Sequence, residues 1–409
     1  METLHISQIL QDTAYVRTGG SPEELRCAEY LVERCAQLGL KANIEAFEVP
    51  MSTIHEAQLI VDGKNIPCKG YLCAGSAEVE APLYYLTGRD AYSLSQARGK
   101  IVLIDGGTGY WLYQDLLENG CLGFITYDGN VRYPDSDIDQ RELRSYVHNG
   151  NRIPAVHINV RDAVELVNSG ASQVKLVLRQ DEYVGNSRNV ILDLPGESQD
   201  TIVFTAHYDS TFLSVGAYDN MSGCIGLLAI AEYFANHPHR CSLRFIWCGS
   251  EERGLLGSKA YCANHEEELK NVVLNINLDM IGCVMGKFSC CCTSEEKLAH
   301  YVEYMGYELG RGVSIMQIAY PSDSTSFADK AIPAVTFARD APPSTATIHN
   351  SYDTAKLMSG EQMVKDIEFI VAFTERMANA KRCPVAREIP DSIKEKLDIY
   401  LARKRPPKK

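Results

Sequence analysis

The run TIVFTAHYDSTFLSVGAYDNMSGCIGLLAIAEYFANHPHRCSLRFIWC spans residues 201–248 and contains two kinds of apolar pattern. Its first and last parts, residues 201–206 and 242–248, are short apolar runs rich in β-branched and aromatic residues, as expected of buried strands. Between them, residues 222–237 form an apolar pattern of a length that suits a helix. A strand, a helix and a second strand in this order indicate a parallel sheet covered by helices.

The same alternation continues toward the C-terminus. Further apolar strands are predicted at residues 272–280 and 332–338, and a further helix is predicted at residues 295–310. The predicted fold class is therefore α/β, with a mostly parallel central sheet flanked by helices.

An amphipathic helix is predicted near the N-terminus. Ser21 can act as its N-cap, Pro22 suits the first helical position, and Glu24 completes the pattern of a capping box. Gly39 is predicted to end the helix, and a strand follows at residues 41–50.

The stretch from about residue 60 to about residue 185 has a different pattern. Short β-rich runs such as KIVLID and LGFITYD alternate with Gly and Asp turns and brief helical pieces. This pattern predicts a smaller β-rich domain at residues 59–185, inserted into a main domain formed by residues 1–58 and 186–385. Residues 386–409 are predicted to form a basic amphipathic helix with a solvated tail.

The composition excludes several classes of protein. The chain has 409 residues, of which 45% are hydrophobic and 23% charged, as in ordinary soluble globular proteins of about two domains. A net charge of -13 argues against a nucleic-acid partner, because such proteins usually carry a basic face. No run reaches the roughly 18 apolar residues of a membrane span.

The N-terminus and the cysteines bear on location. METLHISQILQDTAYV lacks a basic segment followed by an apolar one, so no signal peptide is predicted. The fourteen cysteines are irregularly spaced within apolar runs, which favours reduced core thiols and a cytoplasmic location. Cys290, Cys291 and Cys292 could suggest a metal cluster, but adjacent residues of a strand point to opposite faces, so core thiols are predicted instead.

Polar residues follow the predicted strands at the edge where an α/β sheet binds its ligands. They are His207, Asp209, Asp219, Glu251, Glu252, Asp279 and His349. Taken singly, each is more often structural, since an aspartate before a helix is usually an N-cap and a glutamate pair is usually a solvated turn. Together, two histidines and several carboxylates at one edge would repel each other unless cations neutralised them. Imidazole combined with carboxylate is typical of zinc sites.

The blocks around these residues resemble a known family. VFTAHYDS, GAYDNMSG, GSEERGLLGS, NINLDMIG and YPSDSTSFADKAIPAVTF followed by IHNSYDT are similar, in order and spacing, to the M28 family of zinc peptidases, the co-catalytic aminopeptidases. The resemblance covers the N-terminal segment and residues 186–380. It implies a zinc exopeptidase-like fold, two zinc ions per chain, and peptide substrates with a free N-terminus.

The resemblance also implies a metal-binding role for five of the residues. His207 and Asp279 would bind one zinc ion, and Glu252 and His349 would bind the other. Asp219 would bridge the two ions.

The same resemblance implies the catalytic roles. Glu251 would be the general base for a metal-bridged hydroxide, and Asp209 would hold the ring of His207. Some members have a tyrosine just before the last histidine ligand, where this chain has Ile348. A helper for the oxyanion would then come from elsewhere, and Tyr320 and Tyr218 are both candidates.

The inserted stretch has a resemblance of its own. GKIVLID, ENGCLGFITYDG and IPAVHINVRDAVELV are similar to the protease-associated (PA) domain, which implies a lid that shapes substrate choice. Trp111 and Tyr113 suit either such a lid or the core of the domain.

Three other hypotheses stay open at this point. A carboxypeptidase or dipeptidase of the same family would need a basic residue for a terminal carboxylate, and Arg339 is the only arginine in the segment leading to His349. A glutaminyl cyclase would use a single zinc ion, against which the full ligand set argues. A non-catalytic binding protein of this fold would tend to lack ligands that are all present here.

Overall fold

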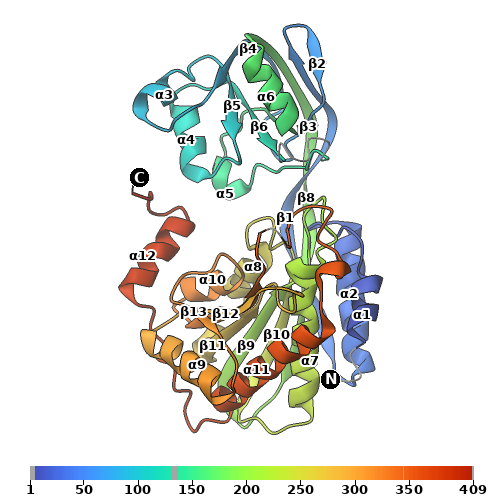
Figure 1. The fold of residues 1–409 in the computed structure, drawn as a ribbon, viewed down its shortest axis with the longest axis vertical. Coiled ribbons are helices and arrows are strands. Elements are labelled where there is room, and N and C mark those ends of the chain that lie inside the picture. The colour runs from blue at the N-terminus through green and yellow to red at the C-terminus, as the bar shows by residue number, and fades with distance from the viewer. Residues whose placement is uncertain (1–4, 130–136, 344, 408–409) are drawn as a thin grey trace. The chain divides into compact units, whose positions relative to one another are not determined.

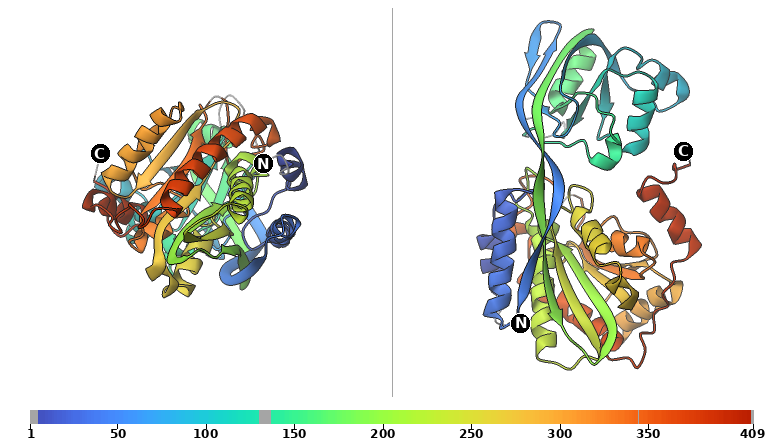
Figure 2. Two further views of the ribbon diagram at one scale, coloured as in Figure 1. Left: turned by 90° about the horizontal axis from the view of Figure 1, so that it is seen from below. Right: turned by 180° about the vertical axis from the view of Figure 1, so that it is seen from behind.

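The structure is a computed structural model that describes residues 5–129, 137–343 and 345–407. It divides into two compact units, the first formed by Met1–Val49 and Asn186–Lys409 and the second by Pro50–Gly185. Two long strands, β1 (Ala42–Val61) and β8 (Gln173–Leu194), pair with each other and carry the chain between the units (Figure 2). The boundary between the units falls within β1. The chain enters the second unit at Pro50, ahead of the boundary expected at residue 59.

The first unit is built on one sheet with the strand order β13-β12-β14-β11-β9-β10-β8 (Figure 1). Besides β8, its strands are β9 (Ser198–His207), β10 (Cys241–Cys248), β11 (Val272–Leu278), β12 (Lys287–Thr293), β13 (Ser314–Met316) and β14 (Ala334–Asp340). The central strands β14, β11, β9 and β10 are parallel, whereas β12 and β8 pair with them antiparallel. The predicted α/β class with a mostly parallel sheet is confirmed.

Helices cover both faces of this sheet (Figure 1). The main core lies under α2 (Pro22–Gln37), α7 (Ser222–Ala235), α9 (Glu296–Glu308) and α11 (Gly360–Ala378). A smaller core on the other face lies under α8 (Leu256–Asn264) and α10 (Ser324–Asp329). The alternation of apolar strand and apolar helix in the sequence reflects this burial on two sides.

The N-terminal helix α2 begins as predicted, but its capping box is incomplete. The Ser21 hydroxyl accepts a hydrogen bond from the Glu24 N–H at 3.0 Å. The Glu24 carboxylate is fully buried and does not return to Ser21; it accepts from the Gly20 N–H at 3.0 Å and from the hydroxyls of Ser187 and Ser250 at 2.5 and 3.3 Å. The reciprocal half of the predicted capping box is therefore wrong, because tertiary contacts occupy this carboxylate.

The cysteines all lie within the described residues, and none of the fourteen is in a disulfide. Cys290 and Cys292 of β12 face the main core with their sulfur atoms 3.8 Å apart, and Cys291 between them is buried outside that core. Across residues 5–129, 137–343 and 345–407, no helix has the length and apolar character needed to cross a bilayer. The cytoplasmic location stays a prediction.

The second unit has a sheet of its own, in the order β8-β4-β5-β6-β7-β3, in which β4 to β7 are parallel. Its strands besides β1 and β8 are β2 (Lys64–Ile66), β3 (Lys69–Gly70), β4 (Ala77–Tyr85), β5 (Ile101–Asp105), β6 (Gly123–Asp128) and β7 (Ala155–Asn159). Its helices are α3 (Ala91–Ser95), α4 (Tyr110–Glu118), α5 (Ser145–His148) and α6 (Val160–Asn168). Tyr113 belongs to the core of this unit, whereas Trp111 is half-buried.

The C-terminal segment ends the first unit with α12 (Asp391–Tyr400). Its apolar residues Ile393 and Leu397 pack with Ala328 of α10. The Arg403 guanidinium also pairs with the Asp329 carboxylate at the end of α10. The helix is thus anchored on the first unit by one face, which differs from the solvated end expected for residues 386–409.

Candidate metal centre

Polar side chains gather where the parallel strands of the first unit end. His207 is the last residue of β9, Asp279 directly follows β11, and Glu251 and Glu252 come shortly after β10. His349 lies in the loop that follows β14. Because the carboxyl ends of parallel strands meet at one edge of a sheet, residues from distant parts of the sequence come together there.

Four of these side chains, together with Asp219, form two overlapping trios whose ligand atoms all lie within 4.8 Å of one another in each trio. In the first trio, His207 Nε2 lies 3.1 Å from Asp219 Oδ1 and 3.7 Å from Asp279 Oδ1. In the second trio, His349 Nε2 lies 3.0 Å from Asp219 Oδ2 and 3.1 Å from Glu252 Oε1. Asp219 belongs to both trios, with one carboxylate oxygen directed toward each histidine.

Asp219 lies in the short segment η1 (Ala217–Met221), directly before α7, where the backbone of Asp219 and Asn220 is not helical. The chain reaches it through Gly216, whose φ of +55° favours glycine. The fully buried Arg17 donates hydrogen bonds to the carbonyls of Val215 and Gly216. The peptide bond that follows Asp219 is cis. Contacts from the N-terminal segment thus hold the backbone that leads to this carboxylate.

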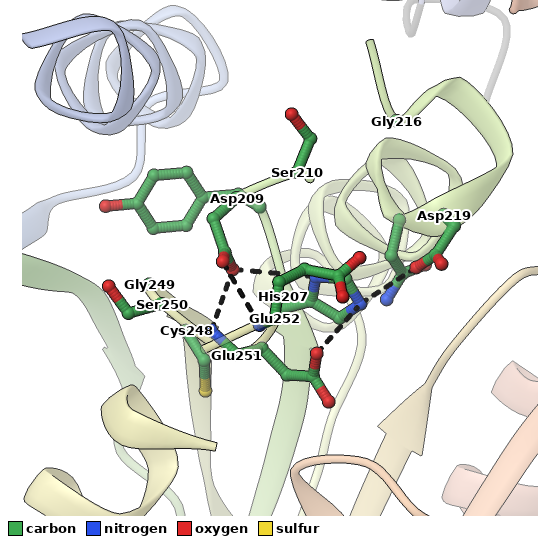
Figure 3. A network of polar contacts seen from close by, with 12 residues as sticks. His207, Asp209, Ser210, Gly216, Asp219, Cys248, Gly249, Ser250, Glu251 and Glu252 are labelled. Atoms are coloured by element: carbon green, nitrogen blue, oxygen red, sulfur yellow. Dashed lines mark hydrogen bonds and ion pairs between the residues drawn. The ribbon is translucent and has the colours of Figure 1, made fainter. Parts of the chain in front are cut away.

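Asp209 organises the turn that carries the two glutamates (Figure 3). One oxygen of its buried carboxylate accepts a hydrogen bond from the Glu251 N–H at 2.9 Å, and the other accepts from the Glu252 N–H at 3.2 Å. Its Oδ1 lies 3.6 Å from His207 Nδ1, which is longer than a hydrogen bond. Glu251 belongs to neither trio, although its Oε2 lies 3.9 Å from His207 Nε2.

The electrostatics of the site are dominated by buried negative charge. Burial opposes a positive charge on His207, but the carboxylates around it, Glu251 foremost, raise its pKa well above the ordinary value. Burial likewise opposes a charge on His349, yet its contacts with Asp219 and Glu252 raise its pKa to about 11. Burial raises the pKa of Glu251 well above its ordinary value, and the charge of Glu252 adds to this effect.

These residues fit zinc. Asp279 Oδ1 is buried and accepts no hydrogen bond from the described residues, so it is available as a ligand atom. The site gathers more carboxylates than its two histidines can neutralise, and divalent cations would remove that imbalance. Imidazole nitrogen and carboxylate oxygen, with no thiolate in either trio, are the donor set of zinc peptidase sites.

The comparisons with known proteins agree with this geometry. A model of peptidase family M28 matches residues 189–374, the stretch that contains every residue of both trios. Residues 189–374 belong to peptidase family M28. Aminopeptidase YwaD of Bacillus subtilis is 31% identical to this M28 chain over 295 residues, which are 69% of this chain and 62% of that protein.

Further relatives extend the comparison. The probable lipoprotein aminopeptidase LpqL of Mycobacterium tuberculosis is 25% identical over 299 residues, which are 68% of this M28 chain and 58% of LpqL. The chain therefore spans about 60% of the length of these two curated relatives. Among solved structures, BSAP, a zinc aminopeptidase from Bacillus subtilis, superposes with a TM-score of 0.76 at 25% identity, covering 95% of this M28 chain and 97% of BSAP.

The two candidate tyrosines of the M28 chain occupy different positions. The Tyr218 hydroxyl donates a hydrogen bond to the Arg339 carbonyl at 2.5 Å and accepts one from the Ala341 N–H at 3.3 Å. It is therefore engaged in holding the loop after β14. The Tyr320 hydroxyl makes no hydrogen bond with the described residues, and burial together with the charge of Asp279 raises its pKa. Tyr320 is the candidate whose hydroxyl stays available.

Two buried aspartates of the M28 chain were missed by the sequence analysis, although both lie in the motif blocks. Asp323 directly precedes α10, where an N-cap would be expected, but its side chain makes no cap hydrogen bond; burial raises its pKa to about 6. Asp353 lies four residues after His349, and its carboxylate accepts hydrogen bonds from the backbone next to Asp219. Spacing alone could not have shown these long-range contacts.

Proposed function

We propose that this M28 chain is a zinc aminopeptidase that removes N-terminal residues from peptides. The observation that carries the proposal is the shared position of Asp219 between two trios of zinc-type ligands. His207 and Asp279 would hold one zinc ion and Glu252 and His349 the other, with Asp219 between them. The two relatives and the BSAP structure, all described as aminopeptidases, support the same activity.

The chain's own residues supply the proton transfers. Zinc, when bound, would lower the pKa of a water molecule toward ~7 and polarise the peptide carbonyl. Glu251, which stands outside both trios, accepts the proton of the attacking water on its carboxylate and returns it to the leaving amine. Burial raises the pKa of Glu251 in the metal-free site, which makes its carboxylate a stronger base than an exposed one. Tyr320, whose hydroxyl makes no hydrogen bond with the described residues, would be the donor to the oxyanion.

The requirement for a free N-terminus follows from charge. The α-amino group of a peptide is a cation or a metal ligand, and it would be attracted to the same acidic centre. An acetylated N-terminus lacks both properties. Anchoring the amine beside the scissile bond would restrict cleavage to the first residue of the chain.

The test is hydrolysis of aminoacyl amides by the zinc-loaded protein, compared with N-acetylated and C-terminally blocked versions of the same substrates. We expect the free amides to be cleaved, N-acetylation to abolish cleavage, and C-terminal blocking to leave it unchanged. A requirement for a free C-terminus would indicate a carboxypeptidase. Absence of any hydrolysis with zinc bound would indicate a non-catalytic binding protein.

The structure removes the support that Arg339 gave to the carboxypeptidase hypothesis. Its guanidinium forms a half-buried ion pair with the Asp366 carboxylate, in which Nε lies 2.9 Å from Oδ2. Its Nη1 donates to the Gly286 carbonyl at 2.9 Å. A guanidinium engaged on these sides is poorly placed to receive the terminal carboxylate of a substrate.

We also propose that the second unit is the PA-like domain that the sequence indicated, with an effect on substrate choice. Every residue of both trios lies in the first unit, so a variant in which a short linker replaces residues 50–185 should keep its zinc affinity. Its preference among aminoacyl amides should broaden, or its KM should rise. Zinc binding and a substrate panel on the purified variant are the measurements. A folded variant that has lost zinc would show that the second unit contributes to the metal centre.

A further inference from the structure

One loop of the first unit carries both His349 and a second buried acidic residue, Asp353. His349 has a φ of +61° and directs Nε2 at the carboxylates of Asp219 and Glu252. Asp353 is fully buried, and its N–H donates to the Asn350 carbonyl at 3.2 Å, which closes a turn between the two residues. The loop then enters a short 3-10 helix, η3 (Ala355–Leu357).

The Asp353 carboxylate binds the backbone of η1 with both of its oxygens. Oδ1 accepts a hydrogen bond from the Tyr218 N–H at 2.7 Å, and Oδ2 accepts one from the Asp219 N–H at 3.1 Å. The carboxylate accepts a third hydrogen bond, also on Oδ2, from the Ser214 hydroxyl at 3.3 Å. The same hydroxyl accepts from the Gly216 N–H at 2.8 Å, so it links the carboxylate to the start of the segment.

The position of the Asp219 backbone decides where both of its carboxylate oxygens lie. One oxygen is 3.1 Å from His207 Nε2 and the other is 3.0 Å from His349 Nε2, so a rotation of this residue would displace both contacts together. Hydrogen bonds from backbone N–H groups to a buried carboxylate are charge-assisted and strongly directional. Arg17 holds the carbonyls before η1, and Asp353 holds the N–H groups within it.

We infer that Asp353 is a positioning residue for the shared ligand, which fixes the Asp219 carboxylate between the two metal positions by holding the N–H groups of Tyr218 and Asp219. The inference rests on the zinc site proposed above and extends it. The loop that supplies His349 to one metal position also orients the ligand common to both positions. Loss of the Asp353 carboxylate should therefore weaken zinc at both positions rather than at the position of His349 alone.

The test is the zinc affinity of Asp353→Asn, measured by competition with a chelator of known affinity. Asparagine keeps the size of the side chain but turns an NH₂ group toward one of the two backbone N–H donors. We expect both zinc ions to bind about 10–100-fold more weakly, the range typical of lost partners of metal ligands. The number of ions bound at saturating zinc should stay unchanged.

Asp62→Asn is the matched control. The Asp62 carboxylate also accepts two neighbouring backbone N–H groups, those of Ser172 and Gln173 at 3.1 and 2.9 Å, within the second unit. We expect this variant to bind zinc with wild-type affinity. Thermal unfolding of both metal-free variants then separates a general loss of stability, which a merely structural role would produce, from a selective loss of zinc affinity.

A folded Asp353→Asn chain with wild-type affinity at both positions would overturn the inference, as would an equal loss of affinity in Asp62→Asn. If Asp353→Asn does not fold, Ser214→Ala removes only the third hydrogen bond to the same carboxylate. We expect it to weaken zinc binding severalfold, and an unchanged affinity would overturn the inference. A wild-type chain that binds no zinc would contradict the proposed function itself, which is a distinguishable result.

Discussion

Glu251→Gln should lower turnover by ~10²–10⁴-fold while the protein keeps its zinc at the wild-type level. Glutamine has the size and hydrogen-bonding capacity of glutamate but cannot accept the proton of the attacking water. Glu251 belongs to neither ligand trio, and the turn that carries it is held by Asp209 through backbone N–H groups, which the substitution leaves intact. The metal ligands should therefore stay in place.

For Glu252→Gln, we expect the loss of zinc to come first and to cause the loss of turnover. Glu252 Oε1 lies 3.1 Å from His349 Nε2 and belongs to the second trio, so glutamine replaces an anionic ligand with a neutral and weaker one. Zinc occupancy should fall first, and activity should fall as a consequence. Added zinc should partly restore this variant and should not restore Glu251→Gln.

Steady-state kinetics and zinc content, measured on the same preparations, distinguish the two variants. Glu267→Gln is a suitable control, because this glutamate is 85% exposed and pairs only with Lys270 among the ion pairs of the described residues. Loss of zinc from Glu251→Gln with full zinc in Glu252→Gln would reverse the two assignments.

Removal of the metal is the second change with a large expected effect. Chelation should abolish hydrolysis, and zinc should restore it. In the metal-free chain the pKa of His349 is raised to about 11, so this imidazole is protonated at neutral pH and zinc must displace the proton. Zinc affinity should therefore fall as the pH is lowered. Proton release on zinc addition and the pH dependence of the affinity are the measurements, and an affinity independent of pH would contradict this account.

The parallel sheet and the position of the site could be predicted because both depend on local patterns. Runs such as residues 201–206 and 242–248 are mostly apolar because helices bury them on two faces. The polar residues that follow these runs meet because parallel strands end at one edge. The sequence pattern alone could not distinguish the roles of the adjacent Glu251 and Glu252. Their positions in the structure differ, since only Glu252 reaches His349.

Contacts between distant segments could not be predicted in this way. The spacing of Ser21 and Glu24 matches a capping box, but the Glu24 carboxylate contacts Ser187 and Ser250 instead. Asp353 has no local signature, and its partners lie more than a hundred residues earlier in the chain. Spacing rules describe neighbours within one helix or strand, whereas packing between elements decides which buried donor a carboxylate reaches.

Zinc content measured alongside activity, during stepwise addition of zinc to the metal-free protein, tests the central claim most directly. Asp219 stands between two sets of ligands, and this arrangement predicts that two ions act together. We predict that activity reaches its maximum only as the bound zinc approaches about two ions per chain. A protein that is fully active with one bound zinc ion would contradict the two-zinc account.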